Sequence, residues 1–323
     1  MELDLSSVTS ENTEAGEKPL KVLILGSGPA GLSAALYAAR GEMDPLVLAG
    51  MDLGGQAGLT NTIENYPGFP EGVGGSELGE LFQKQAERFG ARVEFDSATA
   101  VDLSVRPFKV TTYNREYLAE TLVIATGASP NKLHIPGEEA LTGRGVSWCA
   151  TCDGWFFRNK DVVVVGGGDS ALEEGLFLTR YANNVTVVHR RDSLRAGALL
   201  QKRALDNPKM HFIWSSVVTE IIGQDAVEAV RLKNVATGEM SDFKTDGVFI
   251  FIGHTPNTQL FAGQLDMDNR GYIRTNALME TSVPGVYAAG EASDPTFRQV
   301  ITSAGMGAAA AMQAIKFLER QSV

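Results

Sequence analysis

Two glycine-rich turns, each placed between an apolar run and a helix-forming stretch, limit this chain to a small set of folds. The first turn, Gly26-Ser27-Gly28-Pro29-Ala30-Gly31, follows a predicted strand over 21–25, which is apolar after Lys21, and precedes a predicted helix over 32–40. The second, Gly166-Gly167-Gly168-Asp169-Ser170-Ala171, lies between a predicted strand over 161–165 and a predicted helix over 172–181. Strand, glycine turn and helix in this order form a dinucleotide-binding unit. The sequence therefore predicts an α/β fold with two Rossmann-like, three-layer units.

The glycines of such a turn have separate tasks. Gly26 allows a tight bend, Gly28 lets the backbone approach a pyrophosphate, and Gly31 lets the helix pack close to the strand. The helix N-terminus then faces the phosphates. A lone GxGxxG can be a tight strand–helix turn that binds nothing. With strand and helix both in place, the pattern favours dinucleotide binding.

The end of the next strand predicts which nucleotide the second unit binds. The strand expected over 184–188 runs into His189-Arg190-Arg191-Asp192-Ser193-Leu194-Arg195, about 20 residues after the glycine turn, where an NAD enzyme carries an acid. Arginine there suits a 2′-phosphate, which favours NADPH over NADH. The alternative is a solvated strand end. In the first unit, the strand expected over 45–49 runs into Gly50 without the usual acid.

The chain has only two cysteines, Cys149 and Cys152, and they form a CxxC pair. Such a pair can close and reopen a small disulfide ring, and its thiol pKa is commonly lowered. Two alternatives are half of a zinc site, which needs four ligands, and a structural disulfide, which stabilises little across so short a loop. We interpret the pair as redox-active. The adjacent Asp153 is a candidate general acid–base for the thiol protons, or alternatively a helix cap.

Charge and hydropathy exclude some classes of protein. A net charge of −11 argues against nucleic-acid binding, and the apolar runs are shorter than the ~18 residues that a membrane helix needs. Residues 1–19 are interpreted as a polar, acidic, disordered tail, because they lack the basic start and apolar stretch of a signal peptide. Two cysteines in such a chain fit a reducing cytoplasm. We therefore expect a cytoplasmic protein that binds neither nucleic acid nor membranes.

Three further apolar runs end at glycine, at Gly127, Gly253 and Gly290. Each is typical of a buried strand whose end either approaches a cofactor or simply turns. After Pro256 the chain is too short for a third nucleotide unit, so we expect it to return and complete the first. The predicted domains are residues 20–128 with 255–323, and residues 129–254 inserted between them. An amphipathic helix is expected over 76–89, with Ser76 as its N-cap, and a last helix over 300–320.

Taken together, the ordered motifs resemble the low-molecular-weight, bacterial-type thioredoxin reductases, which are class II pyridine nucleotide-disulfide oxidoreductases. The resemblance runs from about residue 21 to residue 318. Its motifs are GSGPAG at Gly26, GGQ at Gly54, ENYPG at Glu64, ATGA at Ala125, CATCDG at Cys149, GGGDSA at Gly166, HRRDSLR at His189, GHTPN at Gly253 and FRQVITSAG at Phe297.

The resemblance implies an FAD domain in two sequence pieces, an inserted NADPH domain that carries the disulfide, and a homodimer. The implied FAD contacts are Gly26, Ser27, Gly28, Pro29, Ala30, Gly31, Gly50, Gly54, Gly55, Gln56, Asn65, Thr126, Gly127, Gly290, Glu291, Arg298, Gln299 and Val300. The implied NADPH contacts are Gly166, Gly168, Asp169, Ser170, Ala171, His189, Arg190, Arg191 and Arg195. Two positions depart from the family: Glu291 replaces an Asp that contacts the ribityl chain, and Val300 replaces an Ala near the flavin.

The activity implied by the resemblance is thioredoxin-disulfide reduction. NADPH would reduce FAD, FAD would reduce the Cys149–Cys152 disulfide, and the dithiol would reduce thioredoxin or a thioredoxin-like protein. The resemblance places Cys152 toward the flavin and assigns attack on the partner to Cys149. Because the disulfide has to serve both the flavin and a large partner, we expect the inserted domain to rotate about hinges near 127–131 and 253–256. The alternatives are a flavoprotein reductase of a peroxidase or another dithiol partner, and a flavin-based redox sensor.

Overall fold

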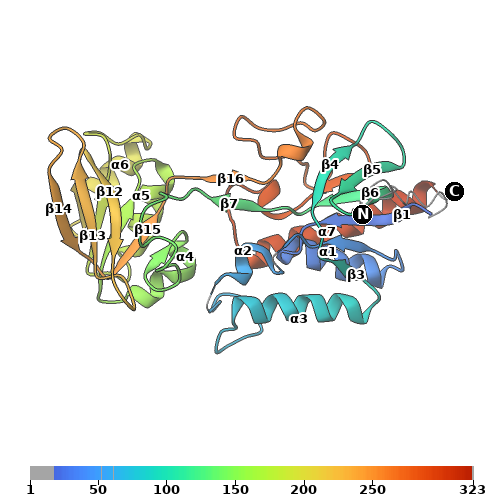
Figure 1. Cartoon of the computed structure of the whole chain (residues 1–323), viewed down its shortest axis with the longest axis horizontal. Helices are drawn as coiled ribbons and strands as arrows, with labels where there is room; N and C mark the ends of the chain where they lie inside the picture. Colours follow the sequence, from blue (N-terminus) through green and yellow to red (C-terminus); the bar gives the residue numbers. More distant parts are fainter. Residues whose placement is uncertain (1–17, 52, 61, 322–323) are drawn as a thin grey trace, which may run out of the picture. The chain divides into compact units, whose positions relative to one another are not determined.

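A computed structural model gives the structure of the protein, and it describes residues 18–51, 53–60 and 62–321 (Figure 1). The expected tail, residues 1–19, lies almost wholly outside the described residues. The described chain divides into two compact units. The first unit comprises the described residues up to Thr62 with Tyr66–Ala128 and the chain from Pro256 onward, and the second comprises Ser129–Thr255 with Ile63–Asn65.

The first unit is built on a sheet whose centre is parallel and whose edge is antiparallel. The parallel strands are β3 (Arg92–Glu94), β2 (Leu46–Leu48), β1 (Leu20–Leu25), β6 (Glu116–Ile124) and β17 (Val286–Ala288). The beginning of β6 pairs with the antiparallel strand β5 (Phe108–Thr112), which in turn pairs with the antiparallel strand β4 (Ala98–Asp102). The apolar run that leads to Gly127 is therefore only the second half of a strand that begins at Glu116, because the first half of that strand belongs to this antiparallel edge.

Helices cover one face of this sheet. They are α1 (Pro29–Arg40), α3 (Gly75–Arg88) and α7 (Val300–Gln321), beside the short α2 (Gly55–Gly58), and Figure 1 shows α1 and α7 side by side. Small residues let α1 and α7 approach closely, since Ala34 and Ala38 pack in one core with Ala310 and Ala314. The opposite face is covered by larger side chains, among them Phe108 and, from η2 (Gln259–Phe261), Phe261.

The predicted N-cap of α3 is wrong. The helix begins at Gly75, and its N-cap is Gly74, which has no side chain with which to cap the helix. Gly74 has an extended backbone, and its carbonyl accepts the N–H of Leu78. A Cβ on Gly75 would overlap the carbonyl oxygen of Ala57. The helix therefore begins one residue before Ser76, at a glycine whose backbone packs closely against Ala57, and Ser76 lies inside the helix.

The second unit has three layers. Its central parallel sheet has the order β11 (Met210–Ile213), β10 (Asn184–Val188), β9 (Asp161–Val165), β15 (Gly247–Ile250) and β8 (Val146–Ser147). One face packs against α4 (Ala150–Asp153), η1 (Gly154–Phe157), α5 (Asp169–Leu178) and α6 (Ala198–Leu205). The other packs against an antiparallel sheet of β12 (Ser216–Ile222), β13 (Ala229–Asn234) and β14 (Met240–Lys244).

Strands and helices thus alternate around two parallel sheets, which confirms the predicted α/β class with two Rossmann-like units. The antiparallel sheet of the second unit was not expected from the sequence. Helix α5 begins at Asp169, before the predicted 172, because the second glycine turn leads directly into it. Among the described residues, no helix is both long and apolar enough to cross a membrane.

The two segments that lead into and out of the second unit pair with each other. β7 (Ala128–Pro130) and β16 (His254–Pro256) form a two-stranded sheet. Asn131 donates its N–H to the carbonyl of Gly253 at 3.0 Å, and Asn257 donates to the carbonyl of Gly127 at 2.9 Å. Both glycines have positive φ, +69° at Gly127 and +105° at Gly253. The two expected hinge segments are therefore hydrogen-bonded neighbours.

Candidate active site

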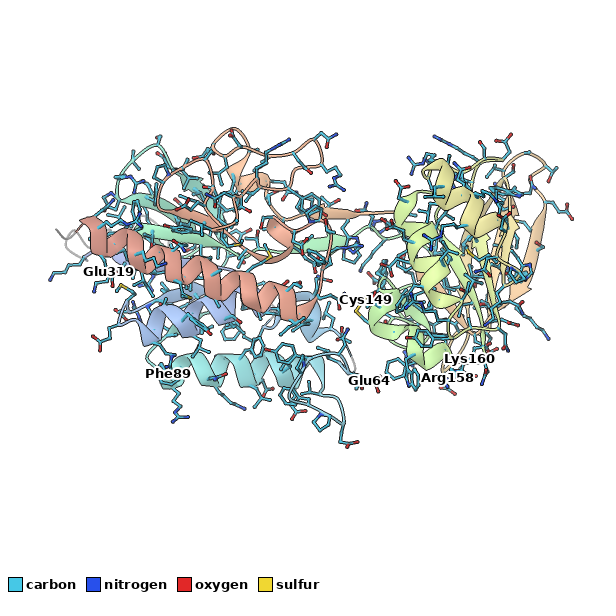
Figure 2. The ribbon with its side chains drawn as sticks, turned by 180° about the vertical axis from the view of Figure 1, so that it is seen from behind. Glu64, Phe89, Cys149, Arg158, Lys160 and Glu319 are labelled. Atoms are coloured by element: carbon cyan, nitrogen blue, oxygen red, sulfur yellow. A yellow bond between two sulfur atoms is a disulfide. The ribbon has the colours of Figure 1, made fainter. Side chains whose placement is uncertain are left out.

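A disulfide joins Cys149 to Cys152 at the end of β8, with 5.3 Å between their Cα atoms. β8 pairs in parallel with β15, so the disulfide follows the carboxyl end of a strand, where α/β proteins place their reacting groups. Cys149 is the N-cap of α4, and its Sγ accepts the N–H of Cys152 at 3.1 Å. The same N–H can stabilise a thiolate on Cys149 once the disulfide opens. Figure 2 shows Cys149 on the second unit.

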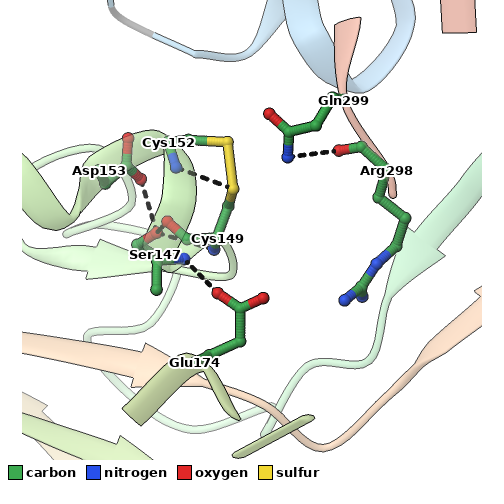
Figure 3. Close-up of a disulfide and its surroundings, with 8 residues drawn as sticks. Ser147, Cys149, Cys152, Asp153, Glu174, Arg298 and Gln299 are labelled. Carbon is green, nitrogen blue, oxygen red and sulfur yellow. Dashed lines mark hydrogen bonds between the residues drawn. A yellow bond between two sulfur atoms is a disulfide. The ribbon is translucent and has the colours of Figure 1, made fainter. Parts of the chain in front are cut away.

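Asp153 lies in a small hydrogen-bonded group beside this disulfide (Figure 3). Its Oδ2 accepts the hydroxyl of Ser147 at 2.5 Å, and the Ser147 Oγ accepts the N–H of Cys149 at 3.0 Å. Glu174 on α5 accepts the N–H of Ala150 at 3.2 Å. Burial raises the pKa of Asp153, and the hydrogen bond from Ser147 partly opposes that rise. An acid with a raised pKa can hold a proton nearer to neutral pH.

The alternative role for Asp153, capping the helix that follows, is not what the structure shows. Asp153 is the last residue of α4 and precedes η1, and its side chain forms no cap hydrogen bond there within the described chain. The carboxylate is turned to Ser147 instead. Ser147 and Glu174 were not identified from the sequence, because neither belongs to a motif. The one available signal for Ser147 was a polar residue two positions before the first cysteine.

The first glycine turn leaves room for a ligand at one point and is closed at two others. A Cβ on Gly26 would overlap the carbonyl of Ala125, and a Cβ on Gly31 would overlap the carbonyl of Gly26. At Gly28, by contrast, no atom of the described chain lies within 4 Å of such a Cβ. Strand–helix packing therefore requires the outer glycines, and Gly28 opens a space at the N-terminus of α1. That cradle fits a pyrophosphate.

Other predicted FAD contacts gather around this turn. Gly54 donates its N–H to the carbonyl of Ser27 at 3.1 Å, and a Cβ on Gly290 would lie 3.0 Å from the Cβ of Ala30. At the end of β6, Thr126 Oγ1 is buried and has no hydrogen-bond partner among the described residues. A buried hydroxyl without a partner fits a site that a polar ligand completes. Asn65 belongs to the short segment grouped with the second unit, so its contact to FAD stays a prediction.

Glu291 lies in η3 (Gly290–Ala292), next to this cradle. Burial raises the pKa of Glu291 to about 7, while Arg298 lowers it and Asp294 raises it further. Asp294 accepts the N–H groups of Thr296 and Phe297, which holds the loop that leads to Arg298 and α7. A neutral Glu291 can donate a hydrogen bond to a ligand hydroxyl, whereas an ionised one only accepts.

The second glycine turn is closed against a basic loop. A Cβ on Gly167 would overlap the imidazole of His189, and Arg195 donates its N–H to the carbonyl of Gly167 at 2.8 Å. Burial, with the charge of Arg195, lowers the pKa of His189. His189 Nε2 is buried and has no hydrogen-bond partner within the described chain. Arg190 and Arg191 are exposed beyond it.

The partnerless imidazole nitrogen of His189 and the two exposed arginines fit a nucleotide that carries an extra phosphate. Asp169 has a structural partner here, because its Oδ1 accepts the N–H of Gly197 at 2.8 Å. That bond ties the end of the basic loop to the start of α5. The predicted role of Asp169 as an NADPH contact therefore stays a prediction. The remaining residues of the turn, Gly166, Gly168, Ser170 and Ala171, lie together at the start of α5.

Comparison with known proteins gives the same picture over nearly the whole chain. Residues 20–309 match the pyridine nucleotide-disulphide oxidoreductase family. A thioredoxin reductase of Streptomyces coelicolor is 49% identical over 300 residues, covering 92% of this chain and 93% of that protein. One of Rickettsia conorii is 52% identical over 305 residues, covering 93% and 98%.

Solved structures agree with the sequence relatives. The crystal structure of a thioredoxin reductase from Streptococcus pyogenes superposes with a TM-score of 0.89 at 44% identity, covering 93% of this chain and 98% of that one. One from Giardia duodenalis has a TM-score of 0.89 at 37% identity, covering 94% and 100%. The chain therefore belongs to the pyridine nucleotide-disulphide oxidoreductases and, within them, to the thioredoxin reductases.

Proposed function

We propose that this chain reduces the disulfide of thioredoxin, or of a thioredoxin-like protein, with electrons that pass from NADPH through FAD to Cys149 and Cys152. The observation that carries the proposal is the disulfide at the end of β8, in the unit that also holds the basic nucleotide turn. The relatives named thioredoxin reductase support the choice of partner. A homodimer in the cytoplasm is proposed from the family resemblance.

We assign FAD to the first unit, residues 20–128 and 255–323, and NADPH to the second, residues 129–254. The space at Gly28 and the partnerless Thr126 hydroxyl support FAD in the first unit. Exposed Arg190 and Arg191, on the loop that closes over Gly167, support a 2′-phosphate in the second. The bound nucleotides would supply the electron pair that opens the disulfide.

The chain's own residues then carry out the thiol–disulfide exchange and the proton transfers. Opening of the disulfide leaves two sulfurs that need protons, and Asp153, whose pKa burial raises, lies beside them to give and take one. The Cys149 thiolate attacks the partner's disulfide, forming a mixed disulfide and releasing a partner thiolate that takes a proton. Cys152 then attacks the Cys149 sulfur, which restores the original disulfide and releases the second partner thiol. Two electrons and two protons pass to the partner.

A single disulfide that collects electrons inside the protein and delivers them to a large partner has to change its surroundings. We propose that β7 and β16 serve as the hinges for this motion, with Gly127 and Gly253 absorbing the change in backbone angles. An engineered crosslink between the two units should abolish multiple turnover and spare flavin binding. Unchanged turnover in the crosslinked protein would rule out the motion.

The test is NADPH oxidation by the flavin-loaded protein with and without oxidised thioredoxin. Thioredoxin should accelerate NADPH oxidation, and NADH should substitute poorly. Cys149→Ser and Cys152→Ser should each remove the acceleration, whereas Thr151→Ser, which lies between them and changes no sulfur, should keep it. A yellow protein that oxidises NADPH no faster with any dithiol partner would contradict the proposal and favour a redox sensor.

A further inference from the structure

The side chain of Ser147 lies between the carboxylate of Asp153 and the backbone of Cys149. Its Oγ is 2.5 Å from Asp153 Oδ2, 3.0 Å from the Cys149 nitrogen and 3.3 Å from the Cys149 oxygen (Figure 3). Ser147 is the last residue of β8, pairs in register with Phe249 of β15 and is only 5% exposed. Strand pairing therefore fixes the hydroxyl in this position.

These three neighbours match both hydrogen-bonding states of a serine. A hydroxyl has one hydrogen to donate and two lone pairs that accept. When Asp153 is ionised, the hydrogen points to Oδ2 and the oxygen accepts the N–H of Cys149. When Asp153 is protonated, the acid donates to the same oxygen, and the serine hydrogen can turn to the carbonyl of Cys149. In both states the Asp153 carboxyl and the N–H of Cys149 keep their hydrogen bonds to Ser147. Leaving a buried polar group without a hydrogen bond would cost free energy.

We propose that Ser147 is a positioning residue that lets the partly buried Asp153 gain and lose a proton during dithiol–disulfide exchange. The inference rests on the proposed function, since it takes Asp153 as the group that handles the thiol protons. Ser147 touches neither reacting sulfur in this role. It acts through Asp153, by completing the hydrogen bonds of the carboxyl in both of its states, and it connects that carboxyl to the peptide unit of Cys149.

The surroundings of Asp153 determine how much the hydrogen bond from Ser147 changes its pKa. Burial raises the pKa of Asp153, and the Ser147 hydroxyl lowers it. The titratable side chains of α5, which packs against α4, are Asp169, Glu173 and Glu174. Glu174 is hydrogen-bonded to the N–H of Ala150, and Tyr181 lies beside Gly154 at the start of η1. The hydroxyl thus opposes the desolvation that favours the protonated form of Asp153.

The variants Ser147→Ala and Ser147→Thr test the proposal. The alanine removes the hydroxyl, and the threonine keeps it. Titration of Asp153 is followed in the oxidised, flavin-loaded full chain by infrared difference spectroscopy, with Asp153→Asn to assign the carboxyl band. We expect Ser147→Ala to move the midpoint upward by about one pH unit, the size of one hydrogen bond, and Ser147→Thr to restore it. An unmoved midpoint in the alanine variant, or an equal shift in the threonine variant, overturns the proposal.

Turnover as a function of pH supplies the second readout. The Asp153-dependent limb of the thioredoxin-linked rate should shift upward in Ser147→Ala by as much as the infrared midpoint, while flavin content and thiol count stay at the wild-type level. A shifted band with an unmoved rate profile overturns the role of Ser147 in exchange. The infrared titration needs neither NADPH nor thioredoxin. A wild-type protein that fails to reduce thioredoxin would thus refute the proposed function and leave the hydrogen-bond measurement readable.

Discussion

The two glycine turns of this protein have the same strand–turn–helix structure and differ in the side chains that pack against them. In each, a Cβ on the first glycine would crowd the carbonyl of a residue just after a neighbouring strand, Ala125 in the first unit and Phe251 in the second. In the first turn, Ser27 then donates to the carbonyl of Ala49 at 2.9 Å. In the second, Gly167 lies against the imidazole of His189. We propose that the turn makes room for a pyrophosphate and that the residues after the second strand of each unit decide which nucleotide binds.

The closest approach of helix and strand also differs between the turns. The last residue of the glycine motif is Gly31 in the first turn and Ala171 in the second, and Ala171 is fully buried. A Cβ at Gly31 would overlap the carbonyl of Gly26, so the first helix sits where a methyl group has no space. The second turn holds that methyl group in its core. The tighter turn should therefore be the less tolerant of the two.

Exchanging these residues should give the largest effect. Gly31→Ala is expected to lose nearly all bound flavin and about 3 kcal/mol of unfolding free energy, because the backbone has to move. Ala171→Gly should keep its flavin and cost about 1 kcal/mol, through helix propensity and a lost buried methyl group. Flavin absorbance after desalting and urea unfolding measure both. Equal flavin loss in the two variants would show that the turns are equivalent.

Among the described residues, each unit holds one partly buried carboxylic acid whose pKa is raised, Glu291 in the first and Asp153 in the second. The rise in the pKa of Asp153 is opposed by a neutral hydroxyl, that of Ser147. The pKa of Glu291 is instead lowered by the charge of Arg298 and raised by that of Asp294. The folded state holds the Glu291 proton up to a pKa of about 7, and the unfolded state releases it near the ordinary glutamate pKa of 4.5. The free energy of unfolding should thus be highest below the unfolded value and fall as pH rises through 7.

Glu291→Gln should remove this slope from the flavin-depleted protein. The slope is worth up to about 3 kcal/mol across the window, from the shift in pKa. The matched control is Glu319→Gln on the exposed face of α7, labelled in Figure 2, which should leave the slope unchanged. Denaturation series at pH values from 4 to 8 provide the measurement. A Gln variant that keeps the wild-type slope would mean that Glu291 is already ionised at low pH.

The basic loop should give the smallest of the three effects, because its arginines are exposed. Arg190→Ala with Arg191→Ala is expected to raise KM for NADPH roughly tenfold, through lost charge-assisted contacts to a 2′-phosphate. KM for NADH should hardly change. Arg180→Ala, an exposed arginine after α5 of the same unit, is the control. Equal losses for both nucleotides would place the phosphate elsewhere.

How far the sequence predicts this molecule depends on whether a contact is local. β9 was predicted over 161–165 and is found as Asp161–Val165, because a continuous apolar run before a glycine turn is a local signal. β14 was missed because its sequence, Met240 to Lys244, is largely exposed and shows no apolar alternation. The cap of α3 was wrong for a related reason. Packing of Gly75 against Ala57, a contact between separate segments, sets the start of that helix.

The same distinction holds at the site. Cys149, Cys152 and Asp153 can be identified from the sequence, because a CxxC pair followed directly by an aspartate is a local pattern of reactive residue types. Ser147 carries no such signature. Its role depends on the pairing of β8 with β15, residues about a hundred positions away, and on the turn that brings Asp153 back to it. Long-range register of this kind is not visible in a single sequence.

The most direct test of the central claim counts free thiols, because Cys149 and Cys152 are the only cysteines in the chain. The flavin-loaded protein is treated without oxygen with NADPH, with NADH or with neither, then alkylated and weighed by mass spectrometry. Both cysteines should become alkylated with NADPH, only a small fraction of molecules should be alkylated with NADH, and none without nucleotide; oxidised thioredoxin added before the alkylating agent should prevent the labelling. If NADPH frees neither thiol while a chemical reductant frees both, the disulfide does not receive electrons from the nucleotide.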